Sequence, residues 1–176
     1  VVGVLGFANW SRALGLWGLR DLGHLWSLSI ELQFCLLWAP FCALIMRRWR
    51  TAEAFAAACL ALFLLLQIHR WFVLADITFG RVGGPRLYNG TDLRLDAFAL
   101  GGCVRAVLMG QSHVARRVQQ FVTRFGPAIL IGGLALQLWL GYSTTFRTYI
   151  RSVWNTNGVT ISSVLLVLGV HASPNF

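Results

Sequence analysis

A single carboxylate, Glu31, lies inside an apolar run that is long enough to cross a membrane. The run, HLWSLSIELQFCLLW (24–38), also contains His24 and Ser27, which share a helix face with Glu31. An ionised side chain at the centre of a bilayer costs roughly 2.5–3.5 kcal/mol, so such residues usually face a bundle interior or a water-filled cavity. We expect Glu31 to serve a functional polar site; the alternative is a protonated Glu31 in a structural hydrogen bond. The opposite face carries Trp26, Ile30, Gln33 and Leu37.

A second polar stretch, RLYNGTDLRLDAFALGG (86–102), begins with a turn signal. Asn89 and Gly90 are typical turn residues, and Thr91 can cap the helix that follows. Asp92 is favourable in the first turn, because its negative charge lies at the positive end of the helix dipole. Local structure is therefore a sufficient explanation for Thr91 and Asp92.

Arg94 and Asp96 are harder to explain by local structure. Two residues apart on a helix, they point to different sides and do not form an obvious mutual pair. Each needs a partner from another segment, and Glu31 and His24 have the suitable charges. We therefore expect a buried network that joins residues 24–31 to residues 92–96. An Arg94 without an acidic partner would instead suit an anionic ligand, since guanidinium binds phosphate through two hydrogen bonds.

Other candidate residues receive a structural interpretation. His69 and Arg70 end an apolar segment, where side chains are expected to snorkel toward the membrane interface. His113 lies in a basic loop, and His171 follows the last apolar run. The four cysteines are scattered with no CxxC spacing, so we expect neither a metal site nor a disulfide framework.

The composition indicates a membrane protein that positions these residues on helices. Of 176 residues, 57% are hydrophobic and 12% are charged, against about 25% charged in soluble domains. The mean hydropathy is +0.65. The net charge of +9 comes from arginines between apolar blocks, as in membrane proteins, so we expect no nucleic-acid partner. The prediction is an all-α, polytopic membrane helix bundle with the lipid bilayer as its surroundings.

About five segments approach or exceed the ~20 apolar residues that span a bilayer. Residues 1–19 are expected to hold a helix end and a loop, and 75–91 an ordered, glycine-rich loop. The predicted spans are 22–46, 53–74, 92–110, 127–146 and 151–172.

A basic stretch, QSHVARRVQQFVTRFG (111–126), precedes the fourth predicted span. Its apolar residues follow a helical period, which is typical of a short helix in the headgroup region; a solvated basic loop explains the pattern equally well. The arginine clusters at 47–50 and 116–124 are expected on the same, cytoplasmic side, although Arg70, Arg81, Arg86 and Arg94 crowd the other side. The apolar residues of the stretch are Val114, Val118, Phe121, Val122 and Phe125.

Both polar stretches resemble motifs of the acyltransferase 3 family of membrane O-acyltransferases. HLWSLSIELQFCLLWAP is similar to the motif H-x-W-S-L-x-x-E-x-Q-F-Y-L-L-W-P, and RLYNGTDLRLDAFALGG to Y-x-G-T-D-x-R-x-D-A-L-x-x-G. The pair Asn9-Trp10 also matches. The sequence departs from the first motif at Leu32, Cys35 and Ala39 but keeps Glu31. The resemblance is strongest over 1–110, and the chain is interpreted as one partial domain, 1–176, truncated at both ends.

The resemblance implies transfer of an acyl group, commonly acetyl, from acyl-CoA to a hydroxyl of a carbohydrate or related cell-envelope acceptor. It implies location in the cytoplasmic (inner) membrane of a bacterium and no permanently bound cofactor or metal. The general base is expected to be a histidine upstream of this chain, so that the fragment alone is inactive. The implied catalytic residues are Glu31, Arg94 and His24, with substrate-binding or site-shaping roles for Trp26, Ser27, Tyr88, Thr91, Asp92 and Asp96.

Two other functions use the same polar network. A transporter could carry a substrate past it, but no predicted span is interrupted by Gly or Pro at its centre and no repeat is visible. A sensor or scaffold could keep the fold without turnover.

Overall fold

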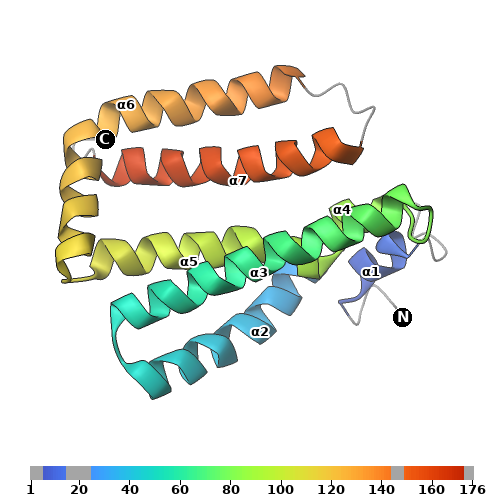
Figure 1. Cartoon of the computed structure of the whole chain (residues 1–176), viewed down its shortest axis with the longest axis horizontal. Coiled ribbons are helices and arrows are strands. Elements are labelled where there is room, and N and C mark those ends of the chain that lie inside the picture. The colour runs from blue at the N-terminus through green and yellow to red at the C-terminus, as the bar shows by residue number, and fades with distance from the viewer. Residues whose placement is uncertain (1–5, 15–24, 144–148, 173–176) are drawn as a thin grey trace. The chain divides into compact units, whose positions relative to one another are not determined.

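The structure is a computed structural model that describes residues 6–14, 25–143 and 149–172. All regular elements in these residues are helices, which confirms the predicted all-α class (Figure 1). Two compact units, 1–99 and 100–176, divide the chain within helix α5. The elements are α1 (Ala8–Ala13), α2 (Leu25–Trp49), α3 (Ala52–Thr78), α4 (Pro85–Asn89), the 3-10 helix η1 (Thr91–Leu93), α5 (Leu95–Met109), α6 (His113–Ser143) and α7 (Tyr149–His171).

Three of the described helices are long and apolar enough to span a membrane, namely α2, α3 and α6. The described part of α7 adds a shorter apolar helix, Thr156–His171. Helix α5 has 15 residues, which extend about 22 Å and fall short of the ~30 Å hydrocarbon core. The chain is therefore an integral membrane helix bundle, with fewer full-length spans in the described residues than the five that the sequence predicts.

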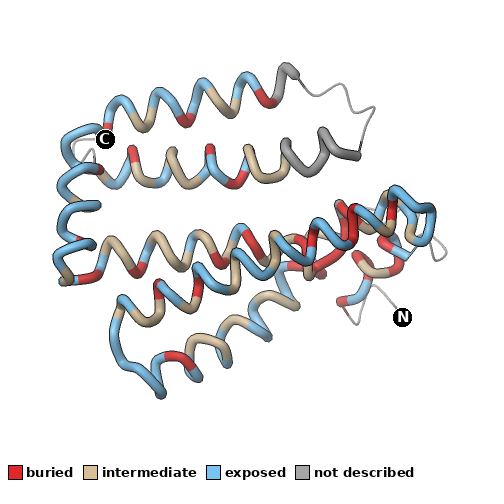
Figure 2. The backbone as a smooth tube through the Cα atoms, viewed as in Figure 1, coloured by how far each residue is buried: buried red, intermediate tan, exposed pale blue. Residues whose placement is uncertain are grey.

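The first unit is built on the antiparallel helices α2 and α3. Thr51 begins α3, because its side-chain oxygen accepts a hydrogen bond from the Ala54 amide at 3.2 Å. Aromatic packing joins the helices to α5, as the ring of Phe34 stacks on Phe98 with centroids 3.6 Å apart. The short elements α1, α4 and η1 gather at the end of α3 where α5 begins, and Figure 2 shows buried residues concentrated there.

The second unit contains a close pair, α6 and α7. Glycines let the two backbones approach, as small residues do between membrane helices. At Gly169 an added Cβ would lie 2.7 Å from the backbone of Leu130. The pair also shares a hydrogen bond from the Ser162 hydroxyl to the Gln137 side chain.

Helix α6 runs through the basic stretch and the fourth predicted span as one element. Figure 1 shows it turning sharply along its length, and Pro127 accounts for the turn because it removes a backbone hydrogen bond inside the helix. The basic stretch is thus the first limb of α6 (113–126) rather than a loop. Of the five apolar residues of the stretch, Val122 is buried and the other four are exposed.

Candidate functional site

An amide and hydroxyl cluster ties α1 and α2 to η1. The Gln33 side chain lies at its centre, where its nitrogen donates to Asn9 Oδ1 at 3.1 Å. Its oxygen accepts hydrogen bonds from the Thr91 hydroxyl and from Trp10 Nε1, the latter at 3.3 Å. Asn9 Nδ2 in turn donates to Thr91 Oγ1 at 2.7 Å and to the Asn89 carbonyl at 3.0 Å. These bonds hold the turn after α4 against the ends of α1 and α2.

A buried ion pair lies next to this cluster. Arg70 Nη2 is 2.7 Å from Asp96 Oδ2, and the two side chains are 3% and 1% exposed. The same guanidinium donates to the Leu93 carbonyl, and Gln67 Nε2 donates to Asp96 at 3.1 Å. The expectation that Arg70 snorkels to the interface is wrong, because its charge is neutralised within the protein.

A second carboxylate, Asp92, holds two basic side chains at the edge of the unit. Its oxygens accept two hydrogen bonds from Arg86, at 2.6 and 2.5 Å, and one oxygen lies 2.6 Å from His69 Nε2. The guanidinium of Arg86 also lies over the ring of Trp10, 4.5 Å from its centroid. His69 remains 45% exposed, so its imidazole is anchored at one end and accessible at the other.

The charges around Asp92 favour its ionised form. Burial alone would raise the pKa of its carboxyl group, but hydrogen bonds from Arg86 and His69, together with their charges, outweigh burial and lower the pKa below its ordinary value. Asp92 is therefore an anion that orients His69 and Arg86.

An open pocket of about 350 Å³ lies beside these residues. Its wall is mostly apolar, with polar side chains contributed by α2 and η1. Such a surface suits a small apolar group with a polar end. The lining residues are Phe7, Trp10, Gln33, Leu36, Leu37, Thr91, Asp92 and Leu95.

One buried acceptor near the pocket residues has no donor. Asn89 Oδ1 is buried and receives no hydrogen bond in the described part of the chain, while Asn89 Nδ2 donates to the Pro85 carbonyl at 2.9 Å. Buried acceptors are normally paired, so this oxygen can accept a hydrogen bond from a water molecule or from a ligand hydroxyl.

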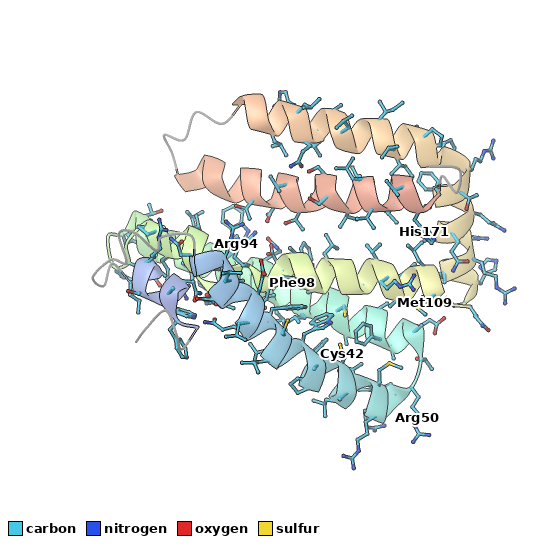
Figure 3. All side chains as sticks on the ribbon, turned by 180° about the vertical axis from the view of Figure 1, so that it is seen from behind. Cys42, Arg50, Arg94, Phe98, Met109 and His171 are labelled. Carbon is cyan, nitrogen blue, oxygen red and sulfur yellow. The ribbon has the colours of Figure 1, made fainter. Side chains whose placement is uncertain are left out.

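Three of the predicted site residues lie together in the structure, whereas Glu31 lies apart from them. Thr91, Asp92 and Asp96 lie at one end of the first unit, in the clusters described above. Arg94 lies at the same end, far from Arg50 at the other end of α2 (Figure 3). Glu31 is exposed, and the described residues give it no hydrogen bond or ion pair.

Three predicted residues cannot be placed at the level of side chains. His24 lies outside the described residues. Trp26 and Tyr88 lie in α2 and α4, and their side chains are also outside the described part. Ser27 is half-buried near the start of α2.

The two polar stretches are linked through Gln33 and Thr91 rather than through residues 24–31 and 92–96 as predicted, and Glu31 is not part of the link. Helix α2 turns Ser29 and Gln33 inward, where the Ser29 hydroxyl accepts a hydrogen bond from the Ala8 amide at 3.2 Å. Glu31 lies about 200° around the helix from Gln33, so it points away from this contact. By charge, the predicted partner of Asp96 is His24, which lies outside the described residues. In the described part, Asp96 is paired with Arg70 and accepts a hydrogen bond from Gln67.

The sequence carries a signal for the burial of Arg70. Arg70 lies three, four and seven residues before Val73, Leu74 and Ile77, so it shares a helix face with these buried apolar residues. Gln67 lies one turn earlier and hydrogen-bonds Arg70 at 3.4 Å. The buried series of α3 is Ala56, Cys59, Arg70, Val73, Leu74 and Ile77.

The described residues provide no cluster of metal ligands. The described residues contain no group of three or more His, Cys, Asp or Glu side chains that could hold an ion. None of the four cysteines, which all lie in the described part, forms a disulfide.

Comparison with known proteins identifies one kind of relative. Over 167 residues the chain is 26% identical to the O-acetyltransferase OatA of Staphylococcus aureus, in strains NCTC 8325 / PS 47, COL and MRSA252 alike. The match covers 90% of this chain and 25% of the relative, so the chain spans about a quarter of its length. No family model and no solved structure matches the chain. The similarity supports an acyltransferase family.

Proposed function

We propose that the protein is a membrane-bound O-acyltransferase of the acyltransferase 3 type. It would move an acyl group, most simply acetyl, from acyl-CoA to a hydroxyl of a carbohydrate or related cell-envelope acceptor, in the inner membrane of a bacterium. The observation that carries the proposal is the similarity to an O-acetyltransferase over 90% of the chain. The two resembling motifs and the membrane helices support it.

Acyl transfer to a hydroxyl needs a base for the hydroxyl proton and donors for the oxyanion of the tetrahedral intermediate. His69 is a candidate base in addition to the histidine expected upstream. Asp92 holds one ring nitrogen of His69, so the other nitrogen can accept a proton. Arg86 neutralises Asp92 and fixes its position.

The remaining predicted residues keep proposed roles. Arg94, directly before α5, is proposed to bind the anionic donor or stabilise the developing charge, with assistance from His24. Glu31 stays a proposed catalytic residue on the opposite face of α2 from Gln33. Thr91 and Asp92 shape the pocket, which we propose receives the acyl group, and Trp26, Ser27 and Tyr88 are proposed to line its surroundings. Asp96 acts through Arg70, as an anchor for the start of α5.

A transfer assay with the full-length protein tests the proposal. Membranes from a host that lacks its own copy are incubated with acetyl-CoA labelled in the acetyl group, and label in cell-envelope polymers is released by mild alkali, which cleaves O-esters. We expect alkali-labile label only when the protein is present. Solute movement across the membrane without any transfer of label would contradict the enzyme and favour a transporter.

His69→Gln tests the proposed base in the same assay. Loss of general base catalysis is expected to lower transfer about 10²–10⁴-fold while the protein still accumulates in the membrane. Arg81→Gln is the matched control, because Arg81 is an exposed residue paired with Asp76. Full activity of His69→Gln would exclude this role for His69 and leave the transfer reaction itself unaffected.

A further inference from the structure

The first limb of α6 (113–126) carries an exposed apolar stripe. Its side chains recur every three or four residues, so they form one line along the helix. The rings of Phe121 and Phe125 are in contact, with centroids 4.8 Å apart. The stripe consists of Val114 (69% exposed), Val118 (37%), Phe121 (57%) and Phe125 (42%).

A different face of the limb packs against its own unit. Ala115 and Val122 are buried, and Gln119 Nε2 donates to the carbonyl oxygens of Leu108 and Gly110 at 2.9 and 3.0 Å. At Gly126 an added Cβ would lie 2.5 Å from the Cβ of Ala172. The limb is therefore already seated within the second unit, and the stripe is a second apolar face that this packing leaves uncovered.

The third face of the limb is basic. Arg116, Arg117 and Arg124 are exposed, and the guanidinium of Arg124 lies 5.5 Å from the ring centroid of Phe125 at the edge of the stripe. No Asp or Glu occurs anywhere in residues 97–176. No acidic side chain within residues 97–176 can therefore neutralise these arginines.

The first limb of α6 runs across the direction of the helices that follow it in the second unit. Figure 1 shows it crosswise to the second limb of α6 and to α7, and Figure 2 shows it exposed over most of its length. The second limb and α7 are apolar helices that pack side by side. When these helices cross a bilayer, a crosswise limb at their end lies in the plane of the membrane surface.

We propose that the first limb of α6 lies in the headgroup layer and binds anionic phospholipids. The stripe enters the acyl-chain region, while Arg116, Arg117 and Arg124 bind lipid phosphate groups at the level of the headgroups. A protein partner would need acidic side chains placed opposite all three arginines, whereas the headgroup layer of an anionic bilayer presents phosphate groups along the whole limb. This proposal does not depend on the acyltransferase activity.

Photocrosslinking tests the position of the stripe. The full-length protein is placed in nanodiscs of equal parts phosphatidylglycerol and phosphatidylcholine, with p-benzoylphenylalanine in place of Phe121 or, as the control, of the exposed Gln120 on the basic side. Illumination of the Phe121 variant is expected to give phospholipid adducts by mass spectrometry, severalfold more than the Gln120 variant. Crosslinks from position 121 to protein alone would overturn the proposal.

The lipid composition of the adducts tests the role of the arginines. Each arginine near the surface favours anionic lipid by about 1 kcal/mol, or about fivefold, so phosphatidylglycerol adducts should predominate at position 121. Combining Arg116→Gln, Arg117→Gln and Arg124→Gln should bring the ratio of the two adducts close to one while the total adduct persists. Equal amounts of both adducts with the arginines intact would overturn anionic lipid binding.

Discussion

Arg70 carries a charge into the interior of the first unit, where a lone guanidinium would be costly. Asp96 neutralises it at 2.7 Å, and Gln67 and the Leu93 carbonyl supply further hydrogen bonds. A buried pair of this kind gains little over a well-packed apolar pair, but loss of one partner leaves the other charged and unpaired. The pair therefore holds α5 against α3 in a defined position and makes the bundle sensitive to either residue.

Arg70→Met is expected to destabilise the full-length protein by about 3–5 kcal/mol, because Asp96 is left buried without its ion partner. Thermal unfolding in detergent, followed by a conformation-sensitive probe, measures the effect. Arg81→Gln is the control, since the Arg81–Asp76 pair is 70% and 41% exposed and is worth at most about 1 kcal/mol. Equal melting temperatures for the two variants would show that Arg70 is not part of the core.

At the scale of elements, the face that each helix presents to its neighbours decides which polar residues are buried. Helix α2 has polar residues on both faces, and it directs Gln33 rather than Glu31 toward α1 and η1. Helices α6 and α7 meet through glycines, which permit backbone approach that no larger residue allows. The close contact between α6 and α7 therefore depends on glycine at the positions where the two helices meet.

Gly169→Ala is expected to weaken the pairing of α6 with α7 by about 1–3 kcal/mol, because its Cβ would lie 2.6 Å from Leu130 Cβ and 2.7 Å from the Leu130 backbone. Gly132→Ala is the matched control in the same helix pair, since an added Cβ there meets nothing within 4 Å. Alanine also favours helix over glycine, so the control should be neutral or slightly stabilising. Thermal unfolding of the two variants makes the comparison, and a stable Gly169→Ala protein would contradict the close approach.

At the scale of the whole molecule, connectivity predicts which ends share a side of the membrane. The arginines at 47–50 lie at the C-terminal end of α2, and the first limb of α6 follows α5. If α3 and α5 both cross, these two basic regions lie on one side, which the positive-inside rule makes cytoplasmic. The candidate site at the ends of α3, α4 and η1 then opens toward the opposite side.

Labelling of single cysteines tests this topology in a background where the four native cysteines are alanine. Arg48→Cys and Arg117→Cys are expected to react with a membrane-impermeant maleimide only in inverted vesicles, which expose the cytoplasmic face. Arg81→Cys, at the other end of α3, is expected to react in intact cells after permeabilisation of any outer membrane. Labelling of Arg48→Cys and Arg117→Cys from opposite sides would show that α3 and α5 do not both cross.

Sequence alone was sufficient for the fold class, and it singled out the stretch 86–102, in which Thr91, Asp92 and Asp96 lie together in the structure. The energy of placing residues in lipid depends on each segment by itself, so apolar blocks predict membrane helices without knowledge of their neighbours. The turn residues Asn89 and Gly90 likewise act locally. The predicted capping role of Thr91 is wrong, because Gly90 precedes η1 without a side-chain cap and the Thr91 hydroxyl donates to Gln33. The resembling motif at 86–102 includes residues that the structure places together at one end of the first unit.

Only the tertiary structure showed which polar groups meet. Periodicity indicates which residues share a helix face. It does not indicate which of two polar faces a neighbouring helix will cover, and α2 has one polar face with Glu31 and another with Gln33. The prediction that Arg70 snorkels to the interface is wrong for the same reason. Its burial depends on an ion pair with Asp96, which lies 26 residues later in the chain. Contacts between distant segments depend on how whole helices pack, and that information is not contained in any single stretch of the chain.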